Sequence, residues 1–173
     1  REKWWFERAS GFIVPSSYLR DELLRRSIEA DRVRICRPGV DERFFRNRKE
    51  RVSGNTHFAR GKNPSGALKL LTVANITPVK GYIELLQVLN DLADFEWCWS
   101  IAGRRDLDPE YARVFFERAE TCRVAGRIHY LGTTTTERTA ELMREADLFL
   151  LASQFEAYGM VLAEARSTGL PIV

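Results

Sequence analysis

The sequence has few of the residues on which several protein classes depend. Its 173 residues include three cysteines and two histidines. The cysteines are odd in number, far apart and without a Cys-x-x-Cys pair, which argues against a disulfide framework and against a zinc site. His57 and His129 are isolated from each other and from any Ser/Asp or metal-ligand pattern. Both histidines are therefore interpreted as structural.

Long hydrophobic runs and the common nucleotide-binding loops are absent as well. No stretch of about 18 apolar residues occurs, so the sequence offers no transmembrane helix. No Gly-x-Gly-x-x-Gly follows a predicted strand, which leaves a nicotinamide dehydrogenase weakly supported, and the Gly-x4-Gly-Lys-Ser/Thr of a P-loop does not occur. With 45% hydrophobic and 29% charged residues, the composition is that of a globular protein.

Basic charge is unevenly distributed along the chain. Residues 1–66 carry 16 Lys and Arg against 9 Asp and Glu, whereas residues 67–173 carry 11 against 15. A basic first third suits phosphate, nucleic acid or an anionic membrane surface. However, its basic residues alternate with acidic ones and match no nucleic-acid-binding signature. We expect no nucleic-acid partner and interpret this part mainly as a solvated, arginine-rich surface.

The apolar pattern divides the chain into three parts. In the first, residues 1–45, an apolar run at 11–15 and another at 33–36 predict strands, with a helix between them that Ser16 or Ser17 can cap. Residues 46–66 are polar with sparse apolar side chains, and they predict a flexible linker or insert. The chain begins without Met and ends inside an apolar run, so we expect it to be an excerpt.

The third part, residues 67–173, alternates strand and helix five times. The strands are short and nearly all apolar, which is typical of a parallel sheet with helices on both faces. We therefore predict an α/β fold with a Rossmann-like, doubly wound parallel sheet. Ligands bind such sheets at the carboxyl ends of the strands. The predicted strands are 67–74, 95–102, 128–131, 147–152 and 170–173, and the predicted helices are 81–92, 109–122, 134–146 (with a capping box at Thr134 and Glu137) and 159–169.

Two acidic residues mark the loop and helix after the fourth strand. Glu156 lies just before a helix that starts near Gly159, where free backbone N–H groups and a glycine can accommodate a phosphate or a sugar. Glu164 interrupts an otherwise apolar stretch of that helix and needs a polar partner, such as a polyol hydroxyl. From the residues alone, Glu156 could equally be a carboxylate that favours the helix dipole, and Glu164 a surface ion-pair partner.

A cation follows the first strand of this third part. Lys80 is the only lysine in residues 70–173, and it lies in the turn between that strand and the next helix. Because that turn is at the carboxyl edge of the sheet, its ammonium group could neutralise a phosphate. An ordinary exposed lysine is the alternative interpretation.

The order of these segments resembles a known family. The sequence Glu-Ala-Tyr-Gly-Met-Val-Leu-Ala-Glu from Glu156 to Glu164 is similar to the E-x7-E motif of retaining nucleotide-sugar glycosyltransferases of family 4, the glycosyl transferases group 1. The resemblance covers nearly the whole chain except residues 46–66. Other segments that resemble the family, in the family's order, are 38–41 (Pro-Gly-Val-Asp), 73–81, 100–103, 130–132 and 146–153.

The resemblance implies a GT-B architecture, in which two Rossmann-like domains enclose the active site. Residues 1–45 would be the end of the N-terminal acceptor domain and the connection between domains. Residues 67–173 would be an incomplete donor-binding domain. Because most of the acceptor domain would then be missing, we expect this chain to bind nucleotide but to be inactive on its own.

The resemblance also implies roles for individual residues. Lys80 would neutralise the diphosphate as it leaves, which is electrostatic stabilisation of the transition state. Glu156 would hold the hydroxyls of the transferred sugar, and these two residues are the predicted catalytic pair. The other predicted donor-binding residues are Glu164 for the ribose, Gly132 and Thr133 against the base, and Tyr158, Gly159, Met160, Val161 and Asn75 around the sugar and diphosphate.

Asn75 departs from the family pattern. Family members often have an arginine five residues before the lysine, where this chain has an asparagine, which can donate a hydrogen bond but carries no charge. Arg104 or Arg105 could supply the missing charge. No metal or other cofactor is expected.

The function implied is retaining transfer of a hexose from a UDP- or GDP-sugar to a glycan or a lipid-linked sugar, in polysaccharide biosynthesis. The resemblance implies a cytoplasmic protein, with peripheral contact at the inner membrane face as an option. The alternatives are a GT-B sugar epimerase or phosphorylase-like enzyme, and a non-catalytic binding module with a basic N-terminal segment.

Overall fold

A computed structural model describes residues 2–45 and 66–173. The chain divides into two compact units. The first contains the residues up to Gly39 together with Glu156–Met160, and the second contains Val40–Phe155 and Val161–Val173. The predicted linker at 46–66 lies outside the described residues except for Gly66, and the domain boundaries stay a prediction.

The first unit is a small α/β assembly. Its elements are α1 (Glu2–Arg8), β1 (Phe12–Val14), α2 (Ser17–Arg25), a 3-10 turn (Ala30–Arg32) and β2 (Val33–Ile35). The two strands pair in parallel, as the crossover through α2 requires. Val14, Ile28 and Val33 form its buried core. Ser16 caps α2 by accepting a hydrogen bond from the Leu19 amide at 3.3 Å.

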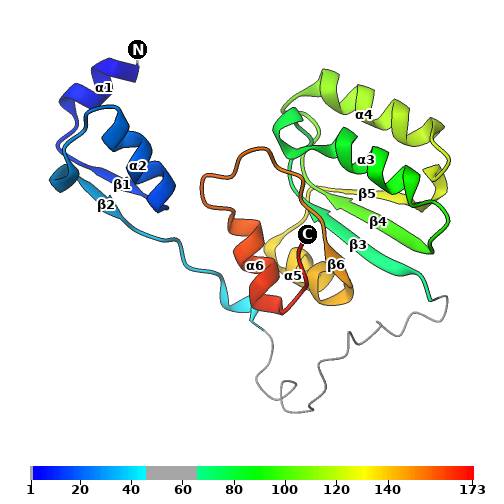
Figure 1. The fold of residues 1–173 in the computed structure, drawn as a ribbon. Coiled ribbons are helices and arrows are strands. Elements are labelled where there is room, and N and C mark those ends of the chain that lie inside the picture. The colour runs from blue at the N-terminus through cyan, green and yellow to red at the C-terminus, as the bar shows by residue number, and fades with distance from the viewer. Residues whose placement is uncertain (1, 46–65) are drawn as a thin grey trace. The chain divides into compact units, whose positions relative to one another are not determined.

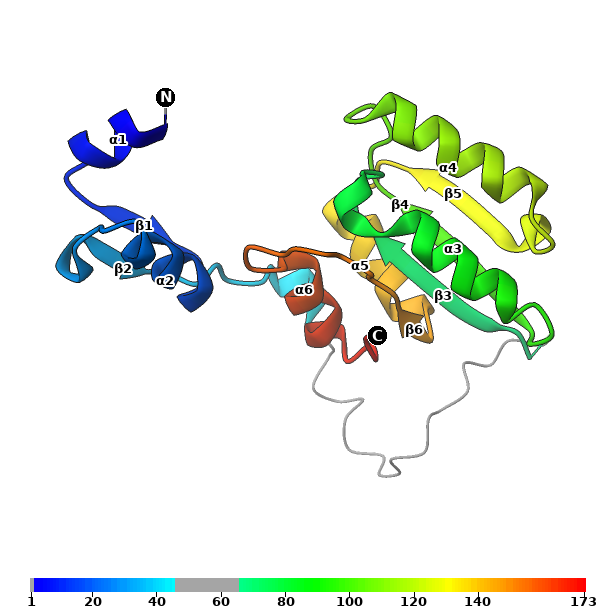
Figure 2. The same ribbon diagram turned by 45° about the horizontal axis from the view of Figure 1, so that its top comes forward.

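The second unit is built around a four-stranded parallel sheet in the order β5-β4-β3-β6. Figures 1 and 2 show α3 and α4 on one face of this sheet and α5 on the other. The predicted α/β class and the doubly wound arrangement are therefore confirmed. In chain order the elements are η2 (Glu42–Phe44), β3 (Leu68–Val73), η4 (Pro78–Lys80), α3 (Tyr82–Asp91), β4 (Trp97–Ala102), α4 (Pro109–Thr121), η5 (Ala125–Arg127), β5 (Ile128–Gly132), α5 (Thr136–Glu145), β6 (Leu148–Phe149) and α6 (Met160–Thr168).

Each face of the sheet has its own hydrophobic core, because successive strand residues point to opposite faces. Leu70 and Trp99 pack beneath α3 and α4, with Phe115 of α4 in the same cluster. Leu71 and Phe149 pack on the opposite face with residues of α5 and α6. The nearly continuous apolar strands of the sequence are thus explained by burial on both sides.

Two predicted strands are shorter than expected. The strand at 147–152 is regular only at Leu148–Phe149, and the one at 170–173 is reduced to a single bridge between Phe149 and Ile172. The backbone remains paired past β6, since the Leu150 amide donates to the Leu71 carbonyl at 2.8 Å and the Leu151 amide to the Val173 carbonyl at 3.0 Å. The course of these two segments along the sheet agrees with the prediction, whereas the length of their regular strands is overestimated.

A fully buried polar chain connects the central strands. The Trp99 indole N–H donates to the Thr72 hydroxyl at 2.9 Å, and that hydroxyl donates to the Leu150 carbonyl at 2.9 Å. Neither Trp99 nor Thr72 has any exposed surface. The Trp99 N–H and the Thr72 hydroxyl therefore both have hydrogen-bond partners, as buried polar groups require.

Thr72→Val should therefore destabilise the fold by about 1–3 kcal/mol, because it leaves the buried Trp99 N–H without an acceptor. Thr72→Ser keeps the hydroxyl and serves as the matched control, with a much smaller expected loss. Urea unfolding monitored by tryptophan fluorescence measures both. Equal stability of the Val and wild-type proteins would contradict a stabilising role for this chain of hydrogen bonds.

Candidate functional site

The loop after β3 carries Lys80, the lysine predicted to neutralise a diphosphate. Residues 78–80 form the short helix η4, and Gly81 follows in the left-handed conformation with φ of 65° before α3 begins. The Tyr82 hydroxyl donates to the Ala74 carbonyl at 2.6 Å, which closes the loop at its base. Burial raises the pKa of Tyr82, so this donor stays protonated at physiological pH. Lys80 is part-exposed on this closed loop at the carboxyl end of β3.

The same loop lies against the segment that follows β6. A Cβ atom at Gly81 would be 2.3 Å from the Ala152 carbonyl oxygen, so only glycine permits this approach. The Gln154 amide donates to the Val79 carbonyl at 2.9 Å. The loop of Lys80 and the beginning of the segment that leads to Glu156 are therefore packed side by side.

Asn75 is exposed at the end of β3 and contacts the loop after β4. Its side-chain oxygen accepts a hydrogen bond from the Arg104 amide at 3.2 Å, and the Ile76 amide donates to the Arg104 carbonyl at 2.8 Å. Asn75 thus connects two neighbouring strand ends. An arginine at this position could not accept that bond.

Of the two arginines after β4, one is paired with a carboxylate and the other lies over an aromatic ring. Arg104 forms a two-point pair with Asp106, with N–O distances of 3.0 and 2.8 Å. This pair raises the pKa of Arg104 and lowers that of Asp106. The Arg105 guanidinium lies 5.8 Å from the centre of the Tyr130 ring. Of the two, Arg104 already has its charge balanced by a carboxylate.

The sequence contains one Asp-x-Asp pair, Asp106 and Asp108, so the expectation that no metal is needed cannot rest on an absence of this motif. Asp106 pairs with Arg104, and Asp108 caps α4 by accepting from the Tyr111 amide at 3.1 Å. Both carboxylates therefore have local structural partners. Within 2–45 and 66–173 no group of three or more His, Cys, Asp or Glu side chains is placed to hold a metal ion.

The end of β5 carries the residues predicted to lie against a base. Gly132 has φ of 73°, and its carbonyl accepts from the Gly103 amide at 2.8 Å. The Tyr130 hydroxyl donates to the Gly103 carbonyl at 2.8 Å. Thr133 follows as an exposed residue. Gly132 and Thr133 thus lie at the same edge of the sheet as Asn75 and Lys80.

The two glutamates of the E-x7-E segment belong to different compact units. Glu156, Tyr158, Gly159 and Met160 group with the first unit, whereas Val161 and Glu164 group with the second. Gly159 is buried, with φ of 76°, and directly precedes α6. Glu156 and Tyr158 are part-exposed. The predicted helix start at Gly159 is confirmed.

Glu164 is half-buried in α6. Burial raises the pKa of its carboxyl group, and the negative charge of Asp41 raises it further. The pKa of Asp41 is instead lowered to about 2, mainly by its hydrogen bonds with Arg43. Glu164 thus lies in an environment that disfavours its charge, and a hydrogen bond from a ligand hydroxyl would stabilise the charged form.

Glu164→Gln should stabilise the protein slightly at neutral pH. A carboxyl group whose pKa is higher in the folded than in the unfolded state costs stability as the pH rises through its pKa. The gain from Gln should therefore be absent at pH 4, appear as the pH rises above 4.5, and stay below about 1 kcal/mol because water screens a half-exposed group. Thermal unfolding of both proteins between pH 4 and 7 measures this difference. A gain that shrinks with rising pH would contradict the assignment.

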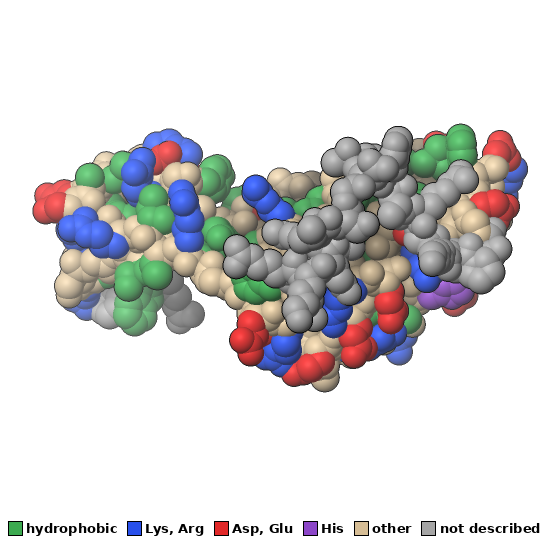
Figure 3. Space-filling model, turned by 90° about the horizontal axis from the view of Figure 1, so that it is seen from below, with side chains coloured by type: hydrophobic (Ala, Val, Ile, Leu, Met, Phe, Trp, Pro, Cys, Tyr) green, Lys and Arg blue, Asp and Glu red, His purple; other side chains and the backbone are tan. Residues whose placement is uncertain are grey.

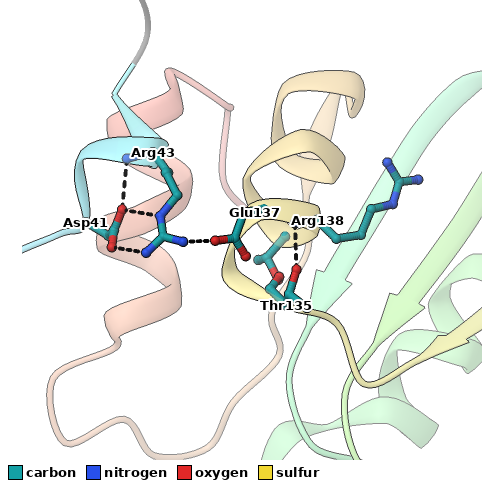
Figure 4. A network of polar contacts seen from close by, with 6 residues as sticks. Asp41, Arg43, Thr135, Glu137 and Arg138 are labelled. Carbon is teal, nitrogen blue, oxygen red and sulfur yellow. Dashed lines mark hydrogen bonds and ion pairs between the residues drawn. The ribbon is translucent and has the colours of Figure 1, made fainter.

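Residues 40–45, expected in the connection between domains, are fixed to the second unit. Phe44 is 1% exposed and packs in the core with Leu71 and Phe149. Figure 4 shows Arg43 between Asp41 and Glu137, with ion pairs to both. The Arg144 side chain of α5 also donates to the Arg43 carbonyl at 2.8 Å. These contacts were not predicted, because Phe44 and Phe45 stand between polar residues and belong to no predicted strand or helix.

The N-terminus of α5 corrects one prediction. Thr135, not Thr134, caps this helix by accepting from the Arg138 amide at 3.3 Å. Glu137 pairs with Arg43. The capping box expected for Thr134 and Glu137 is therefore wrong, because the cap lies one residue later and Glu137 pairs with Arg43 instead.

Comparison with known families agrees with this geometry. The glycosyl transferases group 1 family matches residues 54–173. The chain is 24% identical over 153 residues to D-inositol 3-phosphate glycosyltransferase of Corynebacterium efficiens, which covers 84% of this chain and 35% of that protein. It is 32% identical over 95 residues to an N-acetylgalactosaminyltransferase of Campylobacter jejuni that acts on N,N'-diacetylbacillosaminyl-diphospho-undecaprenol, covering 55% of this chain and 22% of that protein.

Solved structures share the fold. The Anabaena protein HepE in complex with UDP and glucose aligns with a TM-score of 0.78 at 17% identity, covering 98% of this chain and 45% of HepE. Sucrose-phosphate synthase of Thermosynechococcus elongatus aligns with a TM-score of 0.74 at 21% identity, covering 99% of this chain and 42% of that one. These neighbours are GT-B glycosyltransferases.

The chain spans about a third of the length of the D-inositol 3-phosphate glycosyltransferases that it matches. No helix within the described residues has the length and apolar character needed to cross a membrane. The family match extends over most of the chain and includes Lys80 and both glutamates of the E-x7-E segment. This chain is therefore a member of the glycosyl transferases group 1 family, with the sheet of the GT-B fold.

Proposed function

We propose that this chain forms the donor site of a retaining hexosyltransferase that takes a nucleoside-diphosphate sugar. The observation that carries the proposal is the close packing of the Lys80 loop against the segment that leads to Glu156. Gly81 lies against Ala152, and the Gln154 amide is bonded to Val79. This packing sets a cation and residues 152–154, which precede the E-x7-E segment in the chain, at one edge of the sheet, where ligands of such folds bind.

Each group then has a chemical task. As the bond between sugar and diphosphate breaks, negative charge grows on the diphosphate, and the Lys80 ammonium group stabilises it. The first amides of α6, from Met160 and Val161, have no intrahelical acceptor and can donate to the same anion. Glu156 would accept hydrogen bonds from the hydroxyls of the transferred sugar and Glu164 from the ribose.

The remaining donor-binding residues would serve the base and the phosphates. Gly132 and Thr133, at the end of β5, would lie against the base, and Tyr158 and Gly159 would border the sugar. Asn75 would donate one hydrogen bond to the diphosphate through its side-chain nitrogen, since its oxygen is already bonded to the Arg104 amide. Neutralisation of the diphosphate charge would therefore depend more on Lys80 than it does in relatives with a second cation.

The similar proteins support a nucleotide sugar as the donor. HepE was solved with UDP and glucose, with UDP-glucose, and with UDP. The names of the curated relatives describe transfer to a cyclitol phosphate and to a lipid-linked sugar. A glycan or a lipid-linked sugar remains the proposed acceptor of this chain.

A thermal-shift panel with UDP, GDP, ADP and UDP-glucose tests the proposal directly. A ligand that binds only the folded state raises the melting temperature. We expect one of the three nucleoside diphosphates to raise the melting temperature, and UDP-glucose to do so as well if that nucleotide is UDP. A panel in which no nucleotide shifts the transition would refute the donor site. For an active full-length enzyme, the anomeric configuration of the product distinguishes retention from inversion, and release of altered sugar without acceptor would indicate an epimerase.

Binding should not require a divalent metal ion, because Lys80 supplies positive charge from the chain itself. We expect the affinity for the nucleotide diphosphate, measured by calorimetry, to change less than about twofold between 5 mM EDTA and 5 mM MgCl2, a difference too small to reflect loss of a ligand-bridging metal. A loss of tenfold or more in EDTA would contradict metal-independent binding.

The surface of the first unit gives little support to a peripheral membrane contact, because several of its arginines are paired with acidic residues. Arg20 pairs with Asp21, and both Arg25 and Arg26 pair with Glu22. On the face that Figure 3 shows, acidic side chains lie among the basic ones. Mixed charge of this kind gives weak attraction to an anionic surface. The same observation disfavours the alternative of a nucleic-acid-binding module.

A further inference from the structure

We propose that Ser16 is a positioning residue for the loop that carries Glu156. The Ser16 hydroxyl donates a hydrogen bond to the Ala157 carbonyl at 2.7 Å. These two residues are 141 positions apart in the sequence and belong to the same compact unit. Ser16 precedes α2, so the helix start and the loop are joined through one side chain.

The hydroxyl makes two bonds at once. It accepts from the Leu19 amide, which caps α2, and it donates to Ala157. A serine hydroxyl has one donor and two acceptor positions, so the two bonds do not compete. The cap fixes the side-chain rotamer of Ser16 in the direction that the second bond needs. Capping the helix uses Ser16 only as a hydrogen-bond acceptor, so the hydroxyl proton serves the bond to Ala157 alone.

The loop that carries Glu156 has no regular secondary structure. Between Leu150 and Gly159 the chain forms neither helix nor strand. At its beginning the Gln154 amide is bonded to Val79, and beyond Glu156 the Ser16 bond follows at Ala157. The Tyr158 hydroxyl also lies 3.5 Å from the Pro38 carbonyl oxygen, at the long limit of a hydrogen bond.

The consequence concerns the sugar rather than the nucleotide, and it depends on the proposed function. Ala157 is covalently next to Glu156, so the Ser16 bond restrains the backbone from which the Glu156 carboxylate extends. A small displacement of a positioned group can cost a large factor in function. Lys80 lies on another loop and would keep its contact with the diphosphate. Loss of the Ser16 bond should therefore weaken recognition of the sugar and spare that of the nucleotide.

Variants at Ser16 separate the two bonds. Ser16→Thr keeps both and should behave like the wild type. Ser16→Gly and Ser16→Asp still permit a good helix cap, but neither can donate to Ala157. Because only one of them is charged, agreement between the two excludes an effect of charge. Ser17→Ala is the matched control, since the exposed neighbouring serine begins α2.

Hydrogen–deuterium exchange tests the positioning without any ligand. We expect peptides that cover residues 153–160 to exchange at least fivefold faster in Ser16→Gly and Ser16→Asp than in the wild type, Ser16→Thr and Ser17→Ala. Peptides that cover α2 should remain unchanged in the same variants, which also shows that the first unit is folded. Unchanged exchange in residues 153–160 would overturn the proposal, and a change confined to α2 would reduce Ser16 to a helix cap.

Calorimetric titration with UDP and UDP-glucose, or with the nucleotide pair that the panel selects, tests the link to the sugar. The affinity for the free nucleotide should stay within about twofold in every variant. Any gain in affinity that the wild type obtains from the sugar should fall roughly tenfold in Ser16→Gly and Ser16→Asp, the scale of one lost hydrogen bond in a bound complex. If no nucleotide binds the wild type, the donor-site proposal fails, while the exchange experiment still decides the role of Ser16.

Discussion

Replacing Lys80 with alanine should lower the affinity for the nucleoside diphosphate about 30- to 100-fold. Hydrogen bonds between charged partners contribute roughly twice as much as neutral ones, and this change removes one from a diphosphate. In this chain the loss should be at the upper end, because Asn75 brings no charge and Arg104 is paired with Asp106. Calorimetric titration with the nucleotide measures the change directly.

Lys69→Ala is the matched control for that experiment. Lys69 lies near the amino end of β3, whereas Lys80 follows the carboxyl end of the same strand. Both substitutions remove one lysine charge from the same unit, so a general electrostatic effect would lower affinity in both. Equal affinities for wild-type and Lys80→Ala proteins would remove Lys80 from the donor site.

The second large effect is expected for stability, at Gly103. A Cβ atom there would lie 1.9 Å from the Ala74 carbonyl oxygen, and the residue has φ of 152°. The backbone directly after β4 therefore passes too close to the residues directly after β3 to leave room for a side chain at position 103. Gly103→Ala should cost about 2–4 kcal/mol, since it combines backbone strain with a clash against main-chain atoms that cannot turn away. Urea unfolding gives this difference.

Gly126→Ala provides the comparison, because no atom lies within 4 Å of the position where its Cβ would be. This change should be close to neutral, or stabilising through the lower entropy of the unfolded chain. The Gly103 effect should also appear at the site, since Gly103 adjoins Asn75. A Gly103→Ala protein as stable as the wild type would show that these strand ends can move apart without cost.

The sheet and its helices could be predicted because their signals are local. Each strand of residues 67–173 is a short apolar run that ends at a glycine or a polar residue, and each helix has apolar residues at helical spacing. The positions of Lys80 and Gly159 follow from the same alternation. Once a parallel sheet is predicted, the loops after its strands must meet at one edge, whatever their sequence.

The contacts that could not be predicted join residues far apart in the chain. Phe44 enters the core beside Leu71 and Phe149, although the Phe44–Phe45 pair stands between polar residues and belongs to no predicted strand or helix. Asn75 proved to be an acceptor for the Arg104 amide, a role that only the course of two backbones reveals. Ser16 showed its capping role in the sequence but not its bond to Ala157, because nothing local relates residues 16 and 157.

A nucleotide titration of the wild-type chain, followed through its backbone amide NMR shifts, tests the donor site most directly. We expect the shift changes to concentrate in residues 75–81, 132–133 and 159–161, with little change at the amino ends of β3, β4 and β5. Shifts confined to the arginine-rich surface of residues 2–39, or none at saturating nucleotide, would contradict a donor site at the carboxyl edge of this sheet.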